Sequence, residues 1–379
     1  MVLTVGVLAS GCASSPLPPM EAEQACRRFV ERRMMTETGG ILTSTSVRDY
    51  GLFETYDETR LRDSGVLSES TGLMMNYAVA AADRELFEQQ LAYTKSTLTG
   101  QFGLFFWKVS ADGELSADST ASVDDLRIVG ALIDAYKLWG NEEELDLGTQ
   151  IAWAIRKHEM PDDRLRDFVN WRDWGHPTVA DRIQLSYIDL TVLTRLLEYR
   201  PDWKDAVQAN ARLLSDGQAE NGLFFEIYDF NERRYRGPRQ NTINQLYCGL
   251  FLLAADPTQR RLLDFMKAKL DEDGVIYAEY DLETGAPTKF FESTSVYALL
   301  ARYAQAAGEM ELAETVLERL LRFQNTNKRS KLFGSFADDE LYSFDNLEAL
   351  LTLRLYNNAM AAGADTPADK TVGTKGPTP

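Results

Sequence analysis

The feature that most constrains the fold is a pattern that occurs six times along the chain. In each occurrence, a cluster of small polar residues is followed at once by an apolar run with helical spacing. The pattern begins near residues 68, 122, 182, 241, 293 and 344. Amphipathic, charge-rich helices are predicted before the first occurrence, at 21–35, and between the others, at 84–98, 142–158, 203–214, 258–270 and 309–323. A repeat of about 50–60 residues built from two helices indicates an array whose neighbouring units bury each other's apolar faces.

Six such pairs fit a closed ring, with the apolar helices inside and the amphipathic helices outside. We therefore predict an all-α fold, an (α/α)6 barrel, over residues 20–360. An open α-solenoid is the alternative, because both arrangements stack helix pairs in the same way.

A second repeated element consists of short aromatic segments that contain glycine. They occur at 103–109, 222–229, 274–281 and 333–336. Their alternating pattern and the turn residues near them predict short strands or hairpins. Each segment lies between an outer helix and the next inner helix. We therefore expect these hairpins to gather at the end of the ring where the inner helices begin, around an acid-rich cleft with aromatic walls.

Charge and composition exclude several classes of protein. The formal net charge is −18, from 58 acidic and 40 basic residues, so nucleic acid is not expected as a partner. The chain has three cysteines and two histidines, without the spacing of a zinc site. A Ser-His-Asp hydrolase is also disfavoured, and we expect neither a metal nor another cofactor.

The first residues resemble the signal of a bacterial lipoprotein. An apolar run ends in small residues and then Cys12, which would become the lipidated first residue. Residues 1–19 are therefore predicted to be a signal and tether, and the protein to be held outside the cell membrane by its lipid. A chance apolar start is the alternative. Residues 361–379 are predicted to be a disordered tail, and the default oligomeric state is a monomer.

Two motifs, Ser-Glu-Ser-Thr-Gly-Leu at 68–73 and Ala-Ser-Val-Asp-Asp-Leu-Arg at 121–127, resemble glycoside hydrolase family 8. The stretch Ser-Glu-Ser-Thr-Gly-Leu at 68–73 is similar to the family signature Ser-Glu-Gly-x-Gly-Tyr, whose glutamate is the general acid. The stretch Ala-Ser-Val-Asp-Asp-Leu-Arg at 121–127 is similar to Ala-Thr-Asp-Gly-Asp-x-Asp, with Val123 and Arg127 where acids are usual. The resemblance covers about residues 66–140. It implies an (α/α)6 fold, Glu69 as general acid, and Asp125 as a residue that binds the sugar near the scissile bond.

A second carboxylate is needed, because glycosidic cleavage uses one carboxyl as acid and another as base or nucleophile. Many family members carry Tyr-Asp-Ala-x-Arg at a late inner helix, whereas the comparable stretch at 239–244 has amides in place of the acid. We predict Asp229 as the base, with inversion of configuration. Asp181, Glu226 and Glu292 are the alternatives.

Aromatic and basic side chains complete the predicted cleft. We expect Trp107, Tyr187, Trp174 and Arg239 to bind substrate, and Trp171 is a further candidate. The predicted function is cleavage of internal bonds in a β-linked polysaccharide, a bacterial exopolysaccharide or biofilm glycan. The alternatives are a catalytically inactive glycan-binding lipoprotein, or another (α/α)6 enzyme such as a polysaccharide lyase or sugar epimerase.

Overall fold

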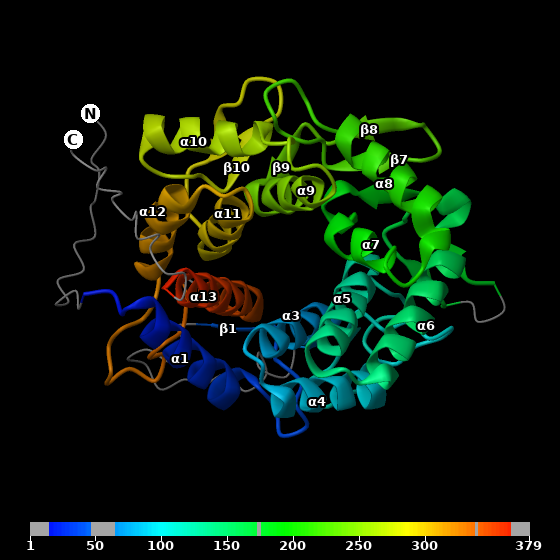
Figure 1. The fold of residues 1–379 in the computed structure, drawn as a ribbon, viewed down its shortest axis with the longest axis horizontal. Coiled ribbons are helices and arrows are strands. Elements are labelled where there is room, and N and C mark those ends of the chain that lie inside the picture. The colour runs from blue at the N-terminus through cyan, green and yellow to red at the C-terminus, as the bar shows by residue number, and fades with distance from the viewer. Residues whose placement is uncertain (1–14, 47–64, 173–175, 338–339, 365–379) are drawn as a thin grey trace, which may run out of the picture.

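The chain folds into a closed ring of helix pairs. The computed structural model describes residues 15–46, 65–172, 176–337 and 340–364. Inner helices pack in sequence around the ring, and the last of them packs on the first, which closes it (Figure 1). They are α3 (Ser68–Ala80), α5 (Ser122–Trp139), α7 (Leu190–Leu196), α9 (Thr242–Ala255), α11 (Thr294–Ala306) and α13 (Ser343–Ala364). Contact between α13 and α3 confirms the barrel and excludes the open solenoid.

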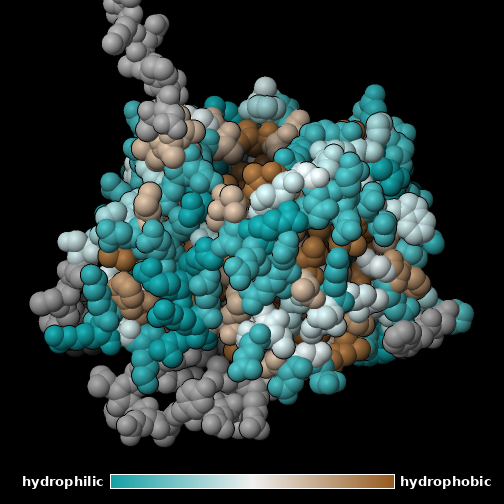
Figure 2. Space-filling model, turned by 60° about the horizontal axis from the view of Figure 1, so that its bottom comes forward, coloured by the Kyte–Doolittle hydropathy of each residue, from teal (hydrophilic) through white to brown (hydrophobic). Residues whose placement is uncertain are grey.

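The outer helices pack on the outside of the inner ring. They are α1 (Pro19–Phe29), α4 (Arg84–Tyr93), α6 (Glu142–His158), α8 (Lys204–Asp216), α10 (Arg261–Asp273) and α12 (Met310–Leu321). Single π-helical turns extend α1 over Val30–Met34 and α4 over Thr94–Leu98. These bounds lie within about three residues of the predicted ones. Figure 2 shows this outer wall as largely hydrophilic, with apolar side chains in its recesses.

Burial explains the division into two layers. The first two-thirds of α5, from Ser122 to Ile133, is buried on every side, as expected for a helix enclosed by neighbours. In α6, by contrast, the buried residues recur at helical spacing and charged residues occupy the other face. The N-terminus of α6 is capped by Asn141, whose side chain accepts from the backbone N–H of Glu143 at 3.3 Å.

The third inner helix begins later than predicted. Residues 182–184 form strand β6 (Arg182–Gln184), and a 3-10 turn (Leu185–Tyr187) separates this strand from α7. The helix starts at Leu190 because Asp189 caps it, accepting from the backbone N–H groups of Thr191 at 2.9 Å and Val192 at 3.2 Å. The apolar pattern from residue 182 onward therefore forms a strand first, and the helix begins only at Leu190.

Short antiparallel strands gather at the end of the ring where the inner helices begin. The strand groups are β2 (Val66–Leu67) with β3 (Lys108–Val109); β6 with β7 (Ile227–Asp229) and β8 (Arg234–Arg236); β9 (Arg239–Asn241) with β10 (Glu279–Asp281) and β11 (Pro287–Lys289); β1 (Ser44–Ser46) with β12 (Glu340–Tyr342); and β4 (Val169–Asn170) with β5 (Thr178–Val179). Strands β2, β9 and β12 each run directly into an inner helix. The predicted placement of the hairpins is therefore confirmed.

Side-chain amides of inner helices attach the aromatic segments to the barrel. Gln245, in the first turn of α9, donates to the carbonyl of Phe224 at 2.9 Å and accepts from its N–H at 2.7 Å. Asn346, at the same position of α13, bonds both backbone groups of Phe336, each at 2.9 Å. Each amide thereby fixes one aromatic segment relative to the helix that follows it.

Candidate active site

A cavity of about 220 Å³ lies at the end of the barrel where the inner helices begin. Its walls come from α3, α5, α9 and α13, from the turn before α7, and from the loop before β3. The lining residues are Leu67, Glu69, Trp107, Ala121, Val123, Asp124, Arg127, Gln184, Ser186, Tyr187, Ile243, Asn244, Tyr247 and Phe344. The structure thus brings together Glu69, Trp107 and Tyr187, which the sequence predicts as site residues.

Glu69 lies in the first turn of α3. Burial, and then the negative charge of Asp124, raise the pKa of the Glu69 carboxyl to about 8, while Arg127 acts in the opposite direction. The carboxyl therefore keeps its proton at neutral pH. A protonated carboxyl in a cavity can donate its proton to a substrate oxygen, which is what a general acid does.

Asp124 fixes the start of α3 against the start of α5. Its Oδ2 accepts from Ser68 Oγ at 2.7 Å, and the backbone N–H of Glu69 also donates to this carboxylate. Its Oδ1 accepts from Arg127 Nη1 at 2.6 Å, and both side chains of this ion pair are buried. Asp124 therefore positions Glu69 through the backbone and holds Arg127 beside it.

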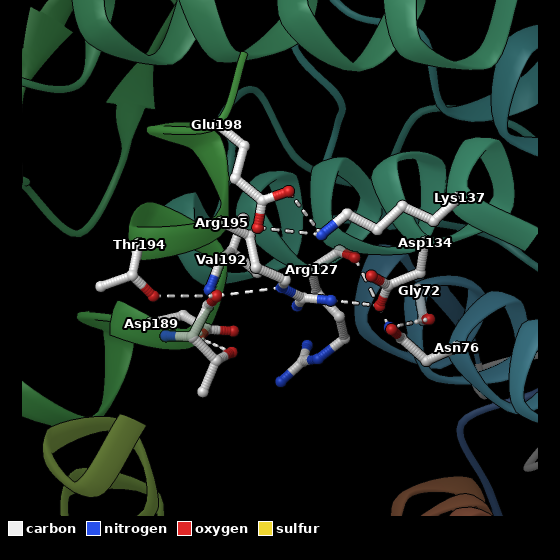
Figure 3. Close-up of polar contacts among 11 residues, drawn as sticks. Gly72, Asn76, Arg127, Asp134, Lys137, Asp189, Val192, Thr194, Arg195 and Glu198 are labelled. Atoms are coloured by element: carbon white, nitrogen blue, oxygen red, sulfur yellow. Dashed lines mark hydrogen bonds and ion pairs between the residues drawn. The ribbon is translucent and has the colours of Figure 1, made fainter. Parts of the chain in front are cut away.

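Arg127 also lines a second, axial cavity of about 120 Å³ deeper in the barrel. Tyr247 lines both cavities and donates to Glu348, which pairs with Arg302 on its other side. Figure 3 shows the neighbouring part of this layer, where Arg127 lies near Asn76 of α3 and Arg195 of α7 pairs with Asp134. The floor of the Glu69 cavity is thus a buried layer of paired charges.

The prediction for Asp125 is wrong, because its side chain faces away from the cavity. Asp125 is 1% exposed, and its Oδ1 accepts from the backbone N–H of Phe105 at 3.1 Å. It occupies the fourth position of α5, which corresponds to Gln245 in α9 and Asn346 in α13. Asp125 therefore anchors an aromatic segment, and the acid that faces the cavity is its neighbour Asp124.

Asp229 lies on the rim of this end and does not line the cavity. It sits in β7, opposite Arg182 of β6, and two residues further along β6 Gln184 reaches the cavity wall. Its Oδ1 accepts from the backbone N–H of Glu232 at 2.8 Å, and Oδ2 lies 3.6 Å from Arg236 Nε. Its role as base stays a prediction.

The other predicted residues are divided between the rim, the core and undescribed parts of the chain. Arg239, in β9, is exposed and does not line the cavity, so the structure does not support its assignment to substrate. Trp171 is 2% exposed and packs edge-on against Phe106, which makes it a core residue. Trp174 and Cys12 lie outside the described residues.

The carboxylates considered as alternative bases differ in the hydrogen bonds and ion pairs that they make. Glu292 pairs with Arg319 at 2.7 Å and accepts from Tyr297, which occupies both its oxygens away from the cavity. Asp181 is exposed and accepts from Asn231 at 2.9 Å. Neither lines the cavity, nor does Glu226.

Several cavity residues escape prediction from the sequence. They are Asp124, Gln184, Asn244, Tyr247 and Phe344. Their common signal is position, because most lie within the first turns of an inner helix. Within the described ranges, no group of three or more His, Cys, Asp or Glu side chains is placed to hold a metal ion. In the same ranges, no helix is long and apolar enough to cross a membrane.

Comparison with known proteins finds a match to the same family over part of the chain. Residues 55–161 match the family model for glycosyl hydrolases family 8. The chain is 25% identical over 348 residues to "Putative lipoprotein YdaJ" of Bacillus subtilis, covering 91% of this chain and 88% of the relative.

Solved structures share the whole barrel. A structure described as a novel alpha-amylase from Clostridium perfringens is 27% identical, with a TM-score of 0.79 over 89% of this chain and 97% of the other. The family 8 endoglucanase Cel10 of Klebsiella pneumoniae shows the same fold at 19% identity, with a TM-score of 0.61 over 88% of this chain and 99% of the other. With the motif at Glu69 and the ring of helix pairs, these matches show that the chain is a glycoside hydrolase similar to those of family 8.

Proposed function

We propose that this glycoside hydrolase cuts internal bonds of a β-linked polysaccharide with inversion of configuration. The observation that carries the proposal is the position of Glu69 in a cavity with walls of Trp107 and Tyr187, where burial raises the pKa of its carboxyl to about 8. Aromatic side chains offer an apolar face to a sugar ring, and the cavity's polar groups can bond its hydroxyls. Glu69 donates its proton to the glycosidic oxygen as the bond to the leaving sugar breaks.

The second carboxylate in this proposal is Asp229. It takes a proton from a water molecule, which attacks the anomeric carbon from the face opposite to Glu69. Its position on β7 supports this role, because β7 pairs with the strand that contributes Gln184 to the cavity. Asp124 is a poorer candidate, since both its oxygens are engaged by Ser68 and Arg127.

The proteins with similar structures are named for substrates that differ in their anomeric linkage. The Klebsiella protein is described as an endoglucanase of family 8, and another neighbour as a β-1,3-1,4-glucanase from Paenibacillus. An α-glucan is a second candidate substrate, because the structure from Clostridium perfringens is called an alpha-amylase and has a TM-score of 0.79.

We also propose that the enzyme is anchored outside the cell by a lipid on Cys12, and that it acts as a monomer on an exopolysaccharide. The relative described as a putative lipoprotein supports the anchor. An enzyme tethered to its own cell surface has ready access to the surrounding matrix. A secreted enzyme that digests nutrient cellulose or xylan would gain little from such a tether.

The test is release of reducing ends from bacterial exopolysaccharides, mixed-linkage β-glucan, xylan and starch. Wild type is compared with Glu69→Gln and Asp229→Asn, and the anomer first formed is followed by NMR. Activity on a β-linked polymer that both substitutions abolish supports the proposal. Cleavage of starch alone supports the α-glucan candidate. An ultraviolet-absorbing unsaturated product indicates a lyase, and binding without cleavage indicates a glycan-binding protein.

A further inference from the structure

A groove of about 460 Å³ lies on the outer wall of the barrel, away from the Glu69 cavity. It runs between α6 and the turn at residues 102–103, and Arg200 closes one side. Its volume falls within the roughly 300–1,000 Å³ typical of small-molecule sites. Two of its residues, Phe102 and Trp153, are large aromatic side chains exposed by 41% and 49%.

We propose that this groove is a second glycan-binding site, which holds a segment of the same polysaccharide that the catalytic cavity cuts. This inference rests on the proposed function for the identity of the polymer. The argument for the site itself comes from the geometry of the groove's side chains.

The ring of Phe102 is held in place before any ligand binds. It stacks on His158 with ring centroids 4.3 Å apart and an interplanar angle of 16°, and its edge meets Trp171. Phe102 has a φ of 61°, a left-handed conformation that is unusual for a bulky residue. Backbone strain that exposes an aromatic ring suggests a role for that ring, since burial would be the ordinary outcome.

Trp153 is fixed in a similar way on α6. The ammonium of Lys157, one turn later, lies 4.6 Å from the centre of its ring. Beside it the groove offers the amide of Gln150 and the oxygen of the Thr149 hydroxyl, which donates its proton to the carbonyl of Asp146. The guanidinium of Arg200 also lines the groove, with two of its nitrogens bonded to Asp202 at 3.0 Å. Aromatic faces for the C–H surface of a sugar, next to donors and acceptors for its hydroxyls, are the chemistry that recognises a neutral glycan.

The groove is connected with the catalytic cavity through one short segment. Trp107, which lines the cavity, follows Phe102 by five residues. Because a fully extended chain spans at most about 3.6 Å per residue, their Cα atoms lie within about 18 Å of each other. In this proposal one polysaccharide chain contacts both sites, and the groove keeps a long substrate on the enzyme between cuts.

The test separates binding from cleavage by using the full chain with Glu69→Gln. Retention is measured in native gels that contain mixed-linkage β-glucan, xylan or soluble starch. Adding Trp153→Ala or Phe102→Ala is expected to weaken retention about 2- to 10-fold, the loss that one aromatic contact produces. Leu138→Ala, at a position that is 47% exposed on α5, is the matched control and should leave retention unchanged.

Activity assays in the wild-type background complete the test. Trp153→Ala should lower kcat/KM on the polymer and leave kcat/KM on a short oligosaccharide unchanged. If the Trp153 and Leu138 variants are retained equally and cleavage is intact, the proposal that the groove binds glycan is wrong, while the proposed hydrolase function still holds. A dimer in light scattering that Trp153→Ala dissociates would identify a self-association surface and also overturns it. If the wild type cuts no polymer and the Glu69→Gln chain binds none, both proposals fail together.

Discussion

Arg127 donates to Asp124 across a distance of 2.6 Å, and this buried ion pair lies directly beside the carboxyl of Glu69. The two charges act on Glu69 in opposite directions, because Asp124 raises the pKa of Glu69 and Arg127 lowers it. The proton on the general acid therefore depends on a balance that a single substitution can disturb.

Asp124→Asn should move the alkaline limb of kcat/KM to lower pH. The substitution removes the negative charge of Asp124, which raises the pKa of Glu69, and leaves the positive charge of Arg127, which lowers it. Glu69 therefore loses its proton at a lower pH. Breaking a buried ion pair should also cost about 3 kcal/mol in the free energy of unfolding. Glu88→Gln, which breaks an exposed pair with Arg84, is the control and should change neither quantity. An unchanged pH profile in Asp124→Asn would contradict this account.

Glu69→Gln should lower kcat by about 10²- to 10⁴-fold, the usual contribution of a general acid. In the wild type, activity should fall as the pH rises through about 8, because the protonated form of Glu69 is the reactive one. The descending limb should be absent from the residual activity of the variant. Initial rates between pH 4 and 10 provide the measurement, with circular dichroism to confirm folding.

Asp229→Asn should also lower kcat by about 10²- to 10⁴-fold, while the melting temperature stays nearly constant. The amide oxygen of asparagine can still accept from the backbone N–H of Glu232, and the ion pair with Arg236 is long at 3.6 Å, so little stability depends on the charge. Asp181→Asn, on the neighbouring strand connection, serves as the comparison. If Asp181→Asn is inactive and Asp229→Asn retains full activity, the base has been assigned to the wrong residue.

Asp125→Asn should stabilise the protein at neutral and alkaline pH. Burial, and then the nearby Glu159, raise the pKa of the Asp125 carboxyl well above its ordinary value of 3.8. When the pKa of a carboxyl is higher in the folded protein than in the unfolded chain, the free energy of unfolding decreases as the pH rises above the unfolded pKa. An amide has no such dependence, and in Gln245 and Asn346 it bonds both backbone groups of the corresponding phenylalanine.

The expected gain for Asp125→Asn is about 1 kcal/mol at pH 8, shrinking towards zero near pH 4. Chemical denaturation at several pH values measures it. Asp125→Ala is the comparison, because it removes the bond to Phe105 and should destabilise at every pH. A gain that does not vary with pH would rule out a protonated carboxyl as the cause.

The barrel could be predicted from the sequence because its periodicity is local and occurs six times. The site was harder to predict, because a motif fixes a residue's neighbourhood but not the face on which its side chain lies. Asp124 and Asp125 are adjacent, and about 100° of helical rotation puts one in the cavity and the other behind it. The start of α7 was misplaced because Arg182–Gln184 pairs with residues more than 40 positions later, and no local pattern reports such a pairing.

The contact of α13 with α3 also means that the ring has no intrinsic first unit. Each helix pair is held by a neighbour on either side, whichever pair is synthesised first. A circularly permuted chain, opened at the exposed turn near Thr258 and joined through its original ends by a flexible linker, should therefore assemble the same barrel. In such a chain the order of synthesis changes, while the set of side chains that meet at the mouth of the ring stays the same.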